Sequence, residues 1–147
     1  MAEKLVKDSI VIHARAEAIW RVLTDPDCTQ KYMFGCRAIS SWKAGSALTW
    51  EMLHEGKTLV AVKGTVLDFQ PPTLLRYTVF DPNGTYRDIP SNHLHVTCTL
   101  TPQDGGVRLD MVQGDFAAVD DGEKRYQDSL AGGDGLIRKI KALAEAT

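Results

Sequence analysis

The sequence predicts a single α+β domain, in which a curved antiparallel sheet of six or seven strands wraps around one long helix near the carboxyl terminus. Three observations support this fold class. Apolar and polar residues alternate through most of the segment from Cys36 to Val112, which is the period of strands with one buried face. Turn residues divide that segment at short intervals, as is typical of antiparallel neighbours. From Glu123 to Glu145 the apolar residues recur instead at helical spacing.

The segment before the sheet predicts one strand and two short helices. Lys4 to His13 alternates loosely between charged and apolar residues, as a strand with one buried face would. An amphipathic helix follows, with apolar residues at i, i+3, i+4 and i+7 from Ala16 to Leu23. Asp25 and Pro26 then predict the N-cap and first position of a second helix that reaches about Tyr32, because proline lacks only a donor that would be unpaired there.

The strands of the central segment predict a sheet with one buried and one wet face. Successive side chains on a strand point to opposite faces, so residues of one parity lie together. The apolar parity, which we assign to the inner face, comprises Leu48, Trp50 and Met52; Leu75, Tyr77 and Val79; Leu94, Val96, Cys98 and Leu100; and Val107, Leu109, Met111 and Gln113. The alternate positions are mostly polar and include His93 and His95.

The predicted terminal helix has a gap in its apolar stripe. The position between Leu130 and Ile137 that should carry bulk is Gly133, within Gly132-Gly133-Asp134-Gly135. Each interior glycine costs a helix roughly 1 kcal/mol relative to alanine, so helix propensity does not explain this stretch. Two interpretations stay open. Either the missing side chain leaves room under the helix for a small apolar ligand, or the chain kinks or breaks there into two helices.

Size and charge restrict the class of protein. The 147 residues predict one domain, 1–147, long enough to bury ~68–70% of its unfolded surface. A net charge of −2 gives no field that would attract nucleic acid. Three cysteines without a close pair favour a reducing cytoplasm. The longest amino-terminal apolar run, Ile10-Val11-Ile12, is far too short for a membrane span or a signal peptide, and the oligomeric state stays open, a homodimer included.

Several segments resemble, in order and spacing, the SRPBCC or START-like superfamily, which includes proteins similar to a birch-pollen allergen. The closest resemblance is to the subgroup named for homology to the activator of a heat-shock-protein ATPase. No single motif is specific, but together the segments cover nearly the whole chain. They are Ile12 through Trp20, Trp42 through Trp50, Gly64 through Tyr77 with its Pro71-Pro72, Asp88 through Leu100, and Leu109 through Gln113.

The resemblance implies the helix-grip fold, with a curved sheet around a long final helix. Members of the family commonly carry a Gly-Trp pair where this chain has Gly132-Gly133. Losing a side chain that buries on the order of 200 Å² should either collapse the sheet onto the helix or leave a cavity. If a cavity remains, Gly133→Trp should raise the melting temperature and abolish ligand uptake.

Catalytic and metal chemistry have little support in the sequence. His93 and His95 alternate on one strand and could share a metal, but no third ligand lies near them, so we predict no metal and no cofactor. Cys98 alternates with polar residues as a small buried apolar residue would, and no nucleophile motif surrounds it. An enzyme would need a perturbed acid or base in the interior, with Asp68, Glu51 or His54 turned inward.

The predicted function is therefore binding of a small hydrophobic or lipid-like molecule between the sheet and the final helix. Gln113 points inward, where its amide could orient a ligand, fix a neighbouring backbone or sit at the wet end of its strand. Two alternatives are an interaction module that regulates a chaperone ATPase, and a cyclase or hydrolase acting on an enclosed aromatic substrate. The predicted lining residues are Tyr32, Met33 and Phe34 as a mobile lip, with Trp50, Tyr77, Val79, Val96, Cys98, Met111, Gln113, Gly133 and Ile137.

Overall fold

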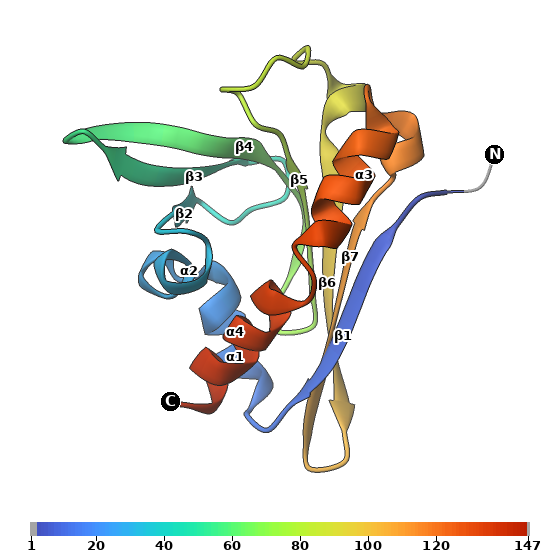
Figure 1. Ribbon diagram of the computed structural model, residues 1–147. Helices are drawn as coiled ribbons and strands as arrows, with labels where there is room; N and C mark the ends of the chain where they lie inside the picture. The colour runs from blue at the N-terminus through green and yellow to red at the C-terminus, as the bar shows by residue number, and fades with distance from the viewer. Residues whose placement is uncertain (1–2, 147) are drawn as a thin grey trace.

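A computed structural model describes residues 3–146 and confirms the α+β helix-grip fold (Figure 1). Every strand pairs antiparallel with its neighbours in one sheet of seven strands, ordered β1-β7-β6-β5-β4-β3-β2. The elements in chain order are β1 (Val6–Ile12), α1 (Ala16–Thr24), α2 (Pro26–Tyr32), β2 (Arg37–Ser40), β3 (Ala47–His54), β4 (Lys57–Gln70), β5 (Leu74–Val79), η1 (Pro90–Asn92), β6 (Leu94–Gln103), β7 (Gly106–Gly114), η2 (Phe116–Ala118), α3 (Gly122–Ala131) and α4 (Gly135–Glu145).

The two short helices lie where the sequence predicts them. Asp25 caps α2, because its carboxylate accepts a hydrogen bond from the backbone N–H of Asp27 at 2.9 Å. Inside α2, Thr29 is fully buried and its hydroxyl accepts a hydrogen bond from the backbone N–H of Ala38 at 2.9 Å. This bond ties α2 to β2, so the chain that follows Tyr32 has a fixed exit towards the sheet.

The sheet curves at its longest strand, β4, which pairs with one neighbour along its first part and with another along its last part. The first part of β4 pairs with β3 and its last residues pair with β5. The register shifts between Trp50 and Glu51 and again between Val66 and Asp68, and such irregularities bend a strand and increase its twist. Consequently the β3–β4 hairpin projects away from the half that contains β1, β7, β6 and β5 (Figure 1).

The core lies between the inner face of the sheet and α1, α2 and α4. Fully buried apolar residues come from β1, α1, β7 and α4, for example Ile12, Ile19, Leu109 and Ile140. The Lys141 ammonium donates a hydrogen bond to the carbonyl of Val11 at 2.9 Å, which fixes α4 to β1. Thus α4, and not the whole carboxyl-terminal segment, fills the core.

The structure decides between the two interpretations of the gap in the segment from Glu123 to Glu145 in favour of a break. The segment breaks into α3 and α4, and Gly133 lies between them with a φ of +63°. No residue of α3 is fully buried, whereas Ile137, Ile140 and Ala144 of α4 are. Gly133 therefore supplies a left-handed backbone residue that lets the chain change direction, as glycine does at helix ends.

Gly133→Ala should lower the free energy of unfolding by about 1 kcal/mol, because an L residue is strained in the left-handed region. The expectation that Gly133→Trp raises the melting temperature is wrong for the same reason. Gly135→Ala is the matched control. Gly135 is the first residue of α4, its φ is not positive, and an added Cβ would meet no atom within 4 Å. The control should be neutral or slightly stabilising in chemical denaturation, and equal losses at both glycines would contradict this account.

Candidate functional site

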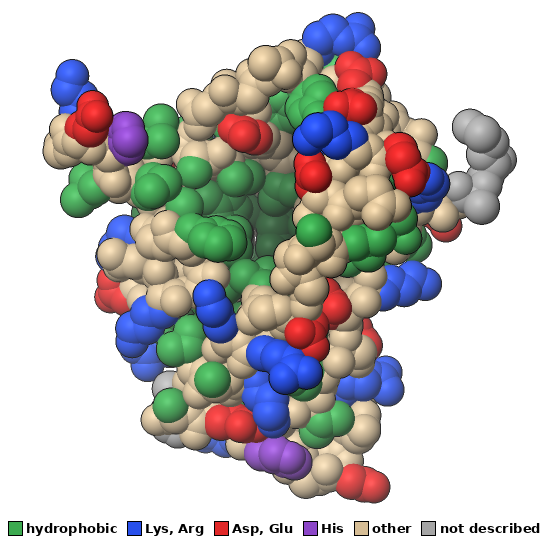
Figure 2. Space-filling model, in the orientation of Figure 1, with side chains coloured by type: hydrophobic (Ala, Val, Ile, Leu, Met, Phe, Trp, Pro, Cys, Tyr) green, Lys and Arg blue, Asp and Glu red, His purple; other side chains and the backbone are tan. Residues whose placement is uncertain are grey.

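A hollow lined by hydrophobic side chains opens between α3 and the β3–β4 hairpin (Figure 2). We call it the inner hollow. The candidate lining residues are partly buried apolar side chains on the inner-face parity of β3, β4, β5 and β7 and in the segment after α2. These side chains pack against the core without being covered completely. They are Met33, Met52, Val62, Val79 and Met111.

Buried aromatic residues lie beside these half-buried ones. The rings of Trp50 on β3 and Tyr77 on β5 have centroids 6.2 Å apart and planes inclined by 46°. Tyr77 stands opposite Val96 on β6, and Val96 stands opposite Gln113 on β7. The structure thus brings together predicted lining residues that are far apart in the sequence, on one face of neighbouring strands.

Burial controls the ionisation of this cluster. It raises the pKa of the Tyr77 and Tyr32 phenols far above their usual range, and the neighbouring Cys98 thiol adds to both shifts. Burial also raises the pKa of Cys98 to about 12. Since the thiolate is the nucleophile, a thiol that stays protonated at neutral pH is unsuited to covalent catalysis.

Gln113 connects the sheet to α3. Its side chain is half-buried, and its amide oxygen accepts a hydrogen bond from the Ser129 hydroxyl at a long distance of 3.5 Å. The inward direction predicted from parity is therefore observed, and the amide bridges to a neighbouring element. A bond of this length is weak and leaves the amide able to change partners.

The other predicted lining residues differ in burial. Phe34 is 84% exposed at the surface, whereas Tyr32 is buried in the core rather than forming a mobile lip. Ile137, on α4, is buried in the core. Gly133 is exposed, and a Cβ built on it would meet no atom within 4 Å. The gap in the apolar stripe therefore marks the turn between helices and does not lie over the aromatic cluster.

Gly133 instead borders an open cavity of about 400 Å³ between β1 and the α3–α4 junction. Asp8 and Asp134 face each other across this cavity, which is also lined by Leu5, Val6, Lys7, Ser129 and Leu130. Burial raises the pKa of the Asp8 carboxyl, and the charge of Asp134 raises it further. Asp8 was not among the predicted site residues, although its parity with Val6 and Ile10 places it on the inner face.

Asp8→Asn should stabilise the protein at neutral pH. A carboxyl whose pKa is raised by folding binds its proton more tightly in the folded state, so its charged form opposes folding above that pKa. The advantage of the variant should shrink as the pH falls through the folded pKa of Asp8, because wild-type Asp8 then becomes neutral. Melting temperatures from neutral to acidic pH test this, with Asp104→Asn in the exposed β6–β7 turn as the control; a pH-independent difference would contradict it.

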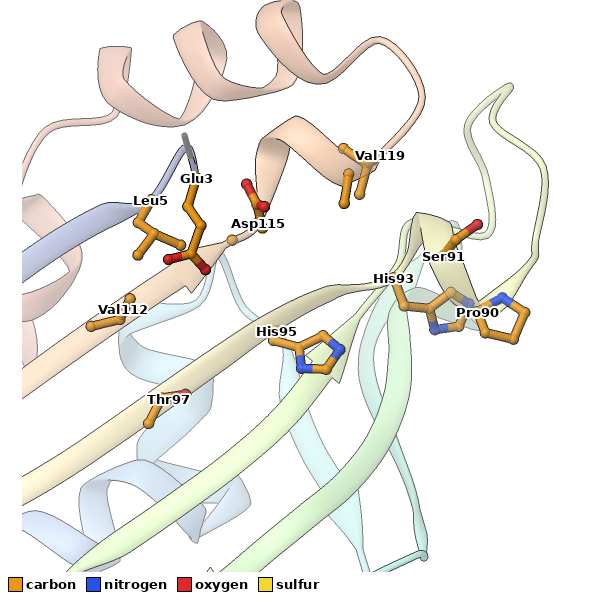
Figure 3. A pocket seen from close by; sticks show the side chains of 12 residues that line it. Glu3, Leu5, Pro90, Ser91, His93, His95, Thr97, Val112, Asp115 and Val119 are labelled. Atoms are coloured by element: carbon orange, nitrogen blue, oxygen red, sulfur yellow. The ribbon is translucent and has the colours of Figure 1, made fainter. Parts of the chain in front are cut away.

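A separate cavity of about 470 Å³ lies on the outer face of the sheet (Figure 3). His93, His95 and Thr97 follow one another along it, and Asp115 stands across from them. His93 lies with His95 and Thr97 as alternation predicts, and its ring is held in place, since it stacks on Phe80 at 4.8 Å and its Nε2 lies 2.8 Å from an Asp88 oxygen. Among residues 3–146, His, Cys, Asp and Glu side chains form no group of three that could hold a metal ion.

The three residues named for the enzymatic alternative, Asp68, Glu51 and His54, do not lie in the interior. The Asp68 carboxylate accepts a hydrogen bond from the Arg76 guanidinium at 2.8 Å, on the polar face of β4 and β5. The Glu51 carboxylate accepts a hydrogen bond from the Thr49 hydroxyl, and His54 is exposed at the end of β3.

Within the described part of the chain, no helix is both long and apolar enough to cross a membrane.

The chain belongs to the family described as activator of Hsp90 ATPase homolog 1-like proteins, whose model matches residues 13–145. This family is part of the START-like superfamily that the sequence motifs resemble. The chain matches no curated protein.

Solved structures agree with this assignment. The solution structure of ChR145 from Cytophaga hutchinsonii is 31% identical, with a TM-score of 0.78 over 99% of this chain and 97% of that one. The crystal structure of MLL2253 from Mesorhizobium loti is 23% identical, with a TM-score of 0.73 over 97% of this chain and 98% of that one. Ara h 8.0201 shares the fold at 16% identity, with a TM-score of 0.68 over 99% of this chain and 100% of that one.

Proposed function

We propose that this protein reversibly binds a small hydrophobic molecule in the inner hollow, in the cytoplasm. The observation that carries the proposal is the hollow itself, where apolar side chains remain partly exposed between α3 and the curved sheet (Figure 2). Exposed apolar surface in a concave site with few polar groups is the usual character of a small-molecule site. The cysteines are all free thiols, which suits a reducing compartment.

The side chains around the inner hollow suit a ligand more than a rigid core. Three of them, Met33, Met52 and Met111, are unbranched thioethers that can adapt to different shapes. Covering their remaining apolar surface stabilises a complex by roughly 25 cal/mol for each Å² removed from water. The helix above them, α3, has no fully buried residue, so it can shift without disrupting the core that α4 forms.

A neutral fluorescent probe, N-phenyl-1-naphthylamine, tests the proposal because its emission rises in apolar surroundings. We expect saturable binding of one probe per chain, and native mass spectrometry of the same sample should show the added mass. Protein purified without denaturation should also be examined for a co-purified small molecule that the probe displaces. Emission that rises linearly without saturation would contradict the proposal.

A further inference from the structure

We infer that the ligand carries an uncharged hydrogen-bond acceptor, such as a carbonyl or ether oxygen, which bonds to the indole N–H of Trp50. This inference rests on the proposed function, because it specifies the chemistry of the molecule held in the inner hollow. It is carried by one polar atom of the buried cluster that has no partner, by the hydrogen-bonding character of the atoms around it, and by the charges on the inner face.

The Trp50 indole nitrogen is a buried donor with no hydrogen bond. Within residues 3–146, it is the one fully buried side-chain nitrogen or oxygen atom without a partner, and the residue is only 3% exposed. An indole N–H can donate but not accept, so only an acceptor can satisfy it. A buried polar group without a partner is rare in folded proteins and marks a place where a bond is missing.

No described atom of the protein accepts a hydrogen bond from the Trp50 indole. Its register neighbours are Ala38 on β2 and Val62 on β4, whose side chains are hydrocarbon. The indole N–H of Trp50 therefore remains a free donor, and a ligand oxygen is the complement that it lacks.

The inner face also selects against an anionic ligand. Across β1, β7, β6 and β5, one row of register partners is Val6, Gln113, Val96 and Tyr77, and the next row is Asp8, Met111, Cys98 and Leu75. Asp8 is the only charged residue in these two rows, and it is acidic. A ligand carboxylate would lose its hydration there without gaining a counter-ion, which is unfavourable.

The acceptor reaches Trp50 by a small side-chain movement. The indole nitrogen has no contact with solvent, so a neighbouring side chain must give way. Met52 lies two residues further along the same face of β3, is only partly buried, and has rotatable bonds that let it move. In the proposed complex Met52 rotates to admit the acceptor while the backbone stays in place.

Matched naphthalenes test the inference, since they share a ring and differ in one group. For each protein the affinity for 2-acetylnaphthalene is divided by the affinity for 2-ethylnaphthalene. We expect this ratio to be about fivefold higher in the wild type than in Trp50→Phe, which is the effect of a single neutral hydrogen bond. The indole resonance of Trp50 in a proton–nitrogen correlation spectrum should move downfield with the ketone and not with the hydrocarbon. Trp42→Phe, on the half-buried ring that stacks on Phe69, is the control and should keep the wild-type preference.

The outcomes separate this inference from the proposed function. If both neutral naphthalenes bind with the same ratio of affinities in wild type and Trp50→Phe, the acceptor inference is overturned while hydrophobic binding stands. If 2-naphthoate binds more tightly than the ketone, the selection for an uncharged group is wrong. If none of the compounds binds, and the fluorescent probe also fails to saturate, the proposed function itself fails.

Discussion

Val79→Trp should abolish binding of N-phenyl-1-naphthylamine while the protein remains folded. Val79 is a partly buried residue at the end of β5, on the inner-face parity of Tyr77. A tryptophan there would add bulk to the inner face and occupy volume that the ligand needs. We expect affinity to fall by more than tenfold, which corresponds to at least about 1.4 kcal/mol.

The matched control is Val112→Trp, which makes the same replacement at a half-buried position on the opposite face of the sheet. Val112 lines the outer cavity with His95 and Thr97. Fluorescence titration of both variants, with circular dichroism to verify folding, therefore distinguishes the two cavities. Loss of binding in Val112→Trp and its retention in Val79→Trp would move the ligand to the outer face.

Gly64→Ala should cause a larger loss of stability than alanine at any other glycine of the described chain. An added Cβ would lie 1.7 Å from the carbonyl oxygen of Thr78, and 2.5 Å from its carbon. Both are backbone atoms, so no side-chain rotation relieves the clash. We expect the free energy of unfolding to fall by about 3 kcal/mol or more, because the strands must separate.

The contacts around Gly64 show why β4 cannot simply shift. Lys63 and Phe80 exchange backbone hydrogen bonds of 2.8 and 2.7 Å, and the Thr65 N–H donates to the Thr78 hydroxyl at 2.9 Å. The bond from the Thr65 N–H satisfies the Thr78 hydroxyl, which is buried although alternation predicted it on the wet face. Thermal unfolding of Gly64→Ala beside the Gly135→Ala control measures the effect, and an unchanged melting temperature would refute the close approach.

The strand half of the molecule could be predicted from the sequence because alternation is a direct consequence of strand geometry. Leu48 and Trp50, like Leu94, Val96 and Cys98, are buried as their parity predicts. The cap at Asp25 could also be predicted, since it depends on neighbouring residues alone. Local patterns with one geometrical meaning were therefore sufficient for the sheet and the first helices.

The carboxyl-terminal segment could not be predicted in the same way. A gap in a helical stripe is compatible with a cavity or with a break, and only the backbone angle at Gly133 distinguishes them. The missing partner of the Trp50 indole was equally inaccessible, because it depends on which atoms of β2, β4 and β5 surround the ring. Asp8 was accessible through its parity, but a charged residue in a loosely alternating strand is a weak signal.

The most direct test of the central claim is a set of nuclear Overhauser contacts between bound N-phenyl-1-naphthylamine and the methyl groups of the protein. We expect contacts from the probe to the methyls of Met52, Val79 and Met111, the partly buried residues that the proposal places around the inner hollow. Contacts to Val112 and Val119 of the outer cavity, without any to these three residues, would contradict it.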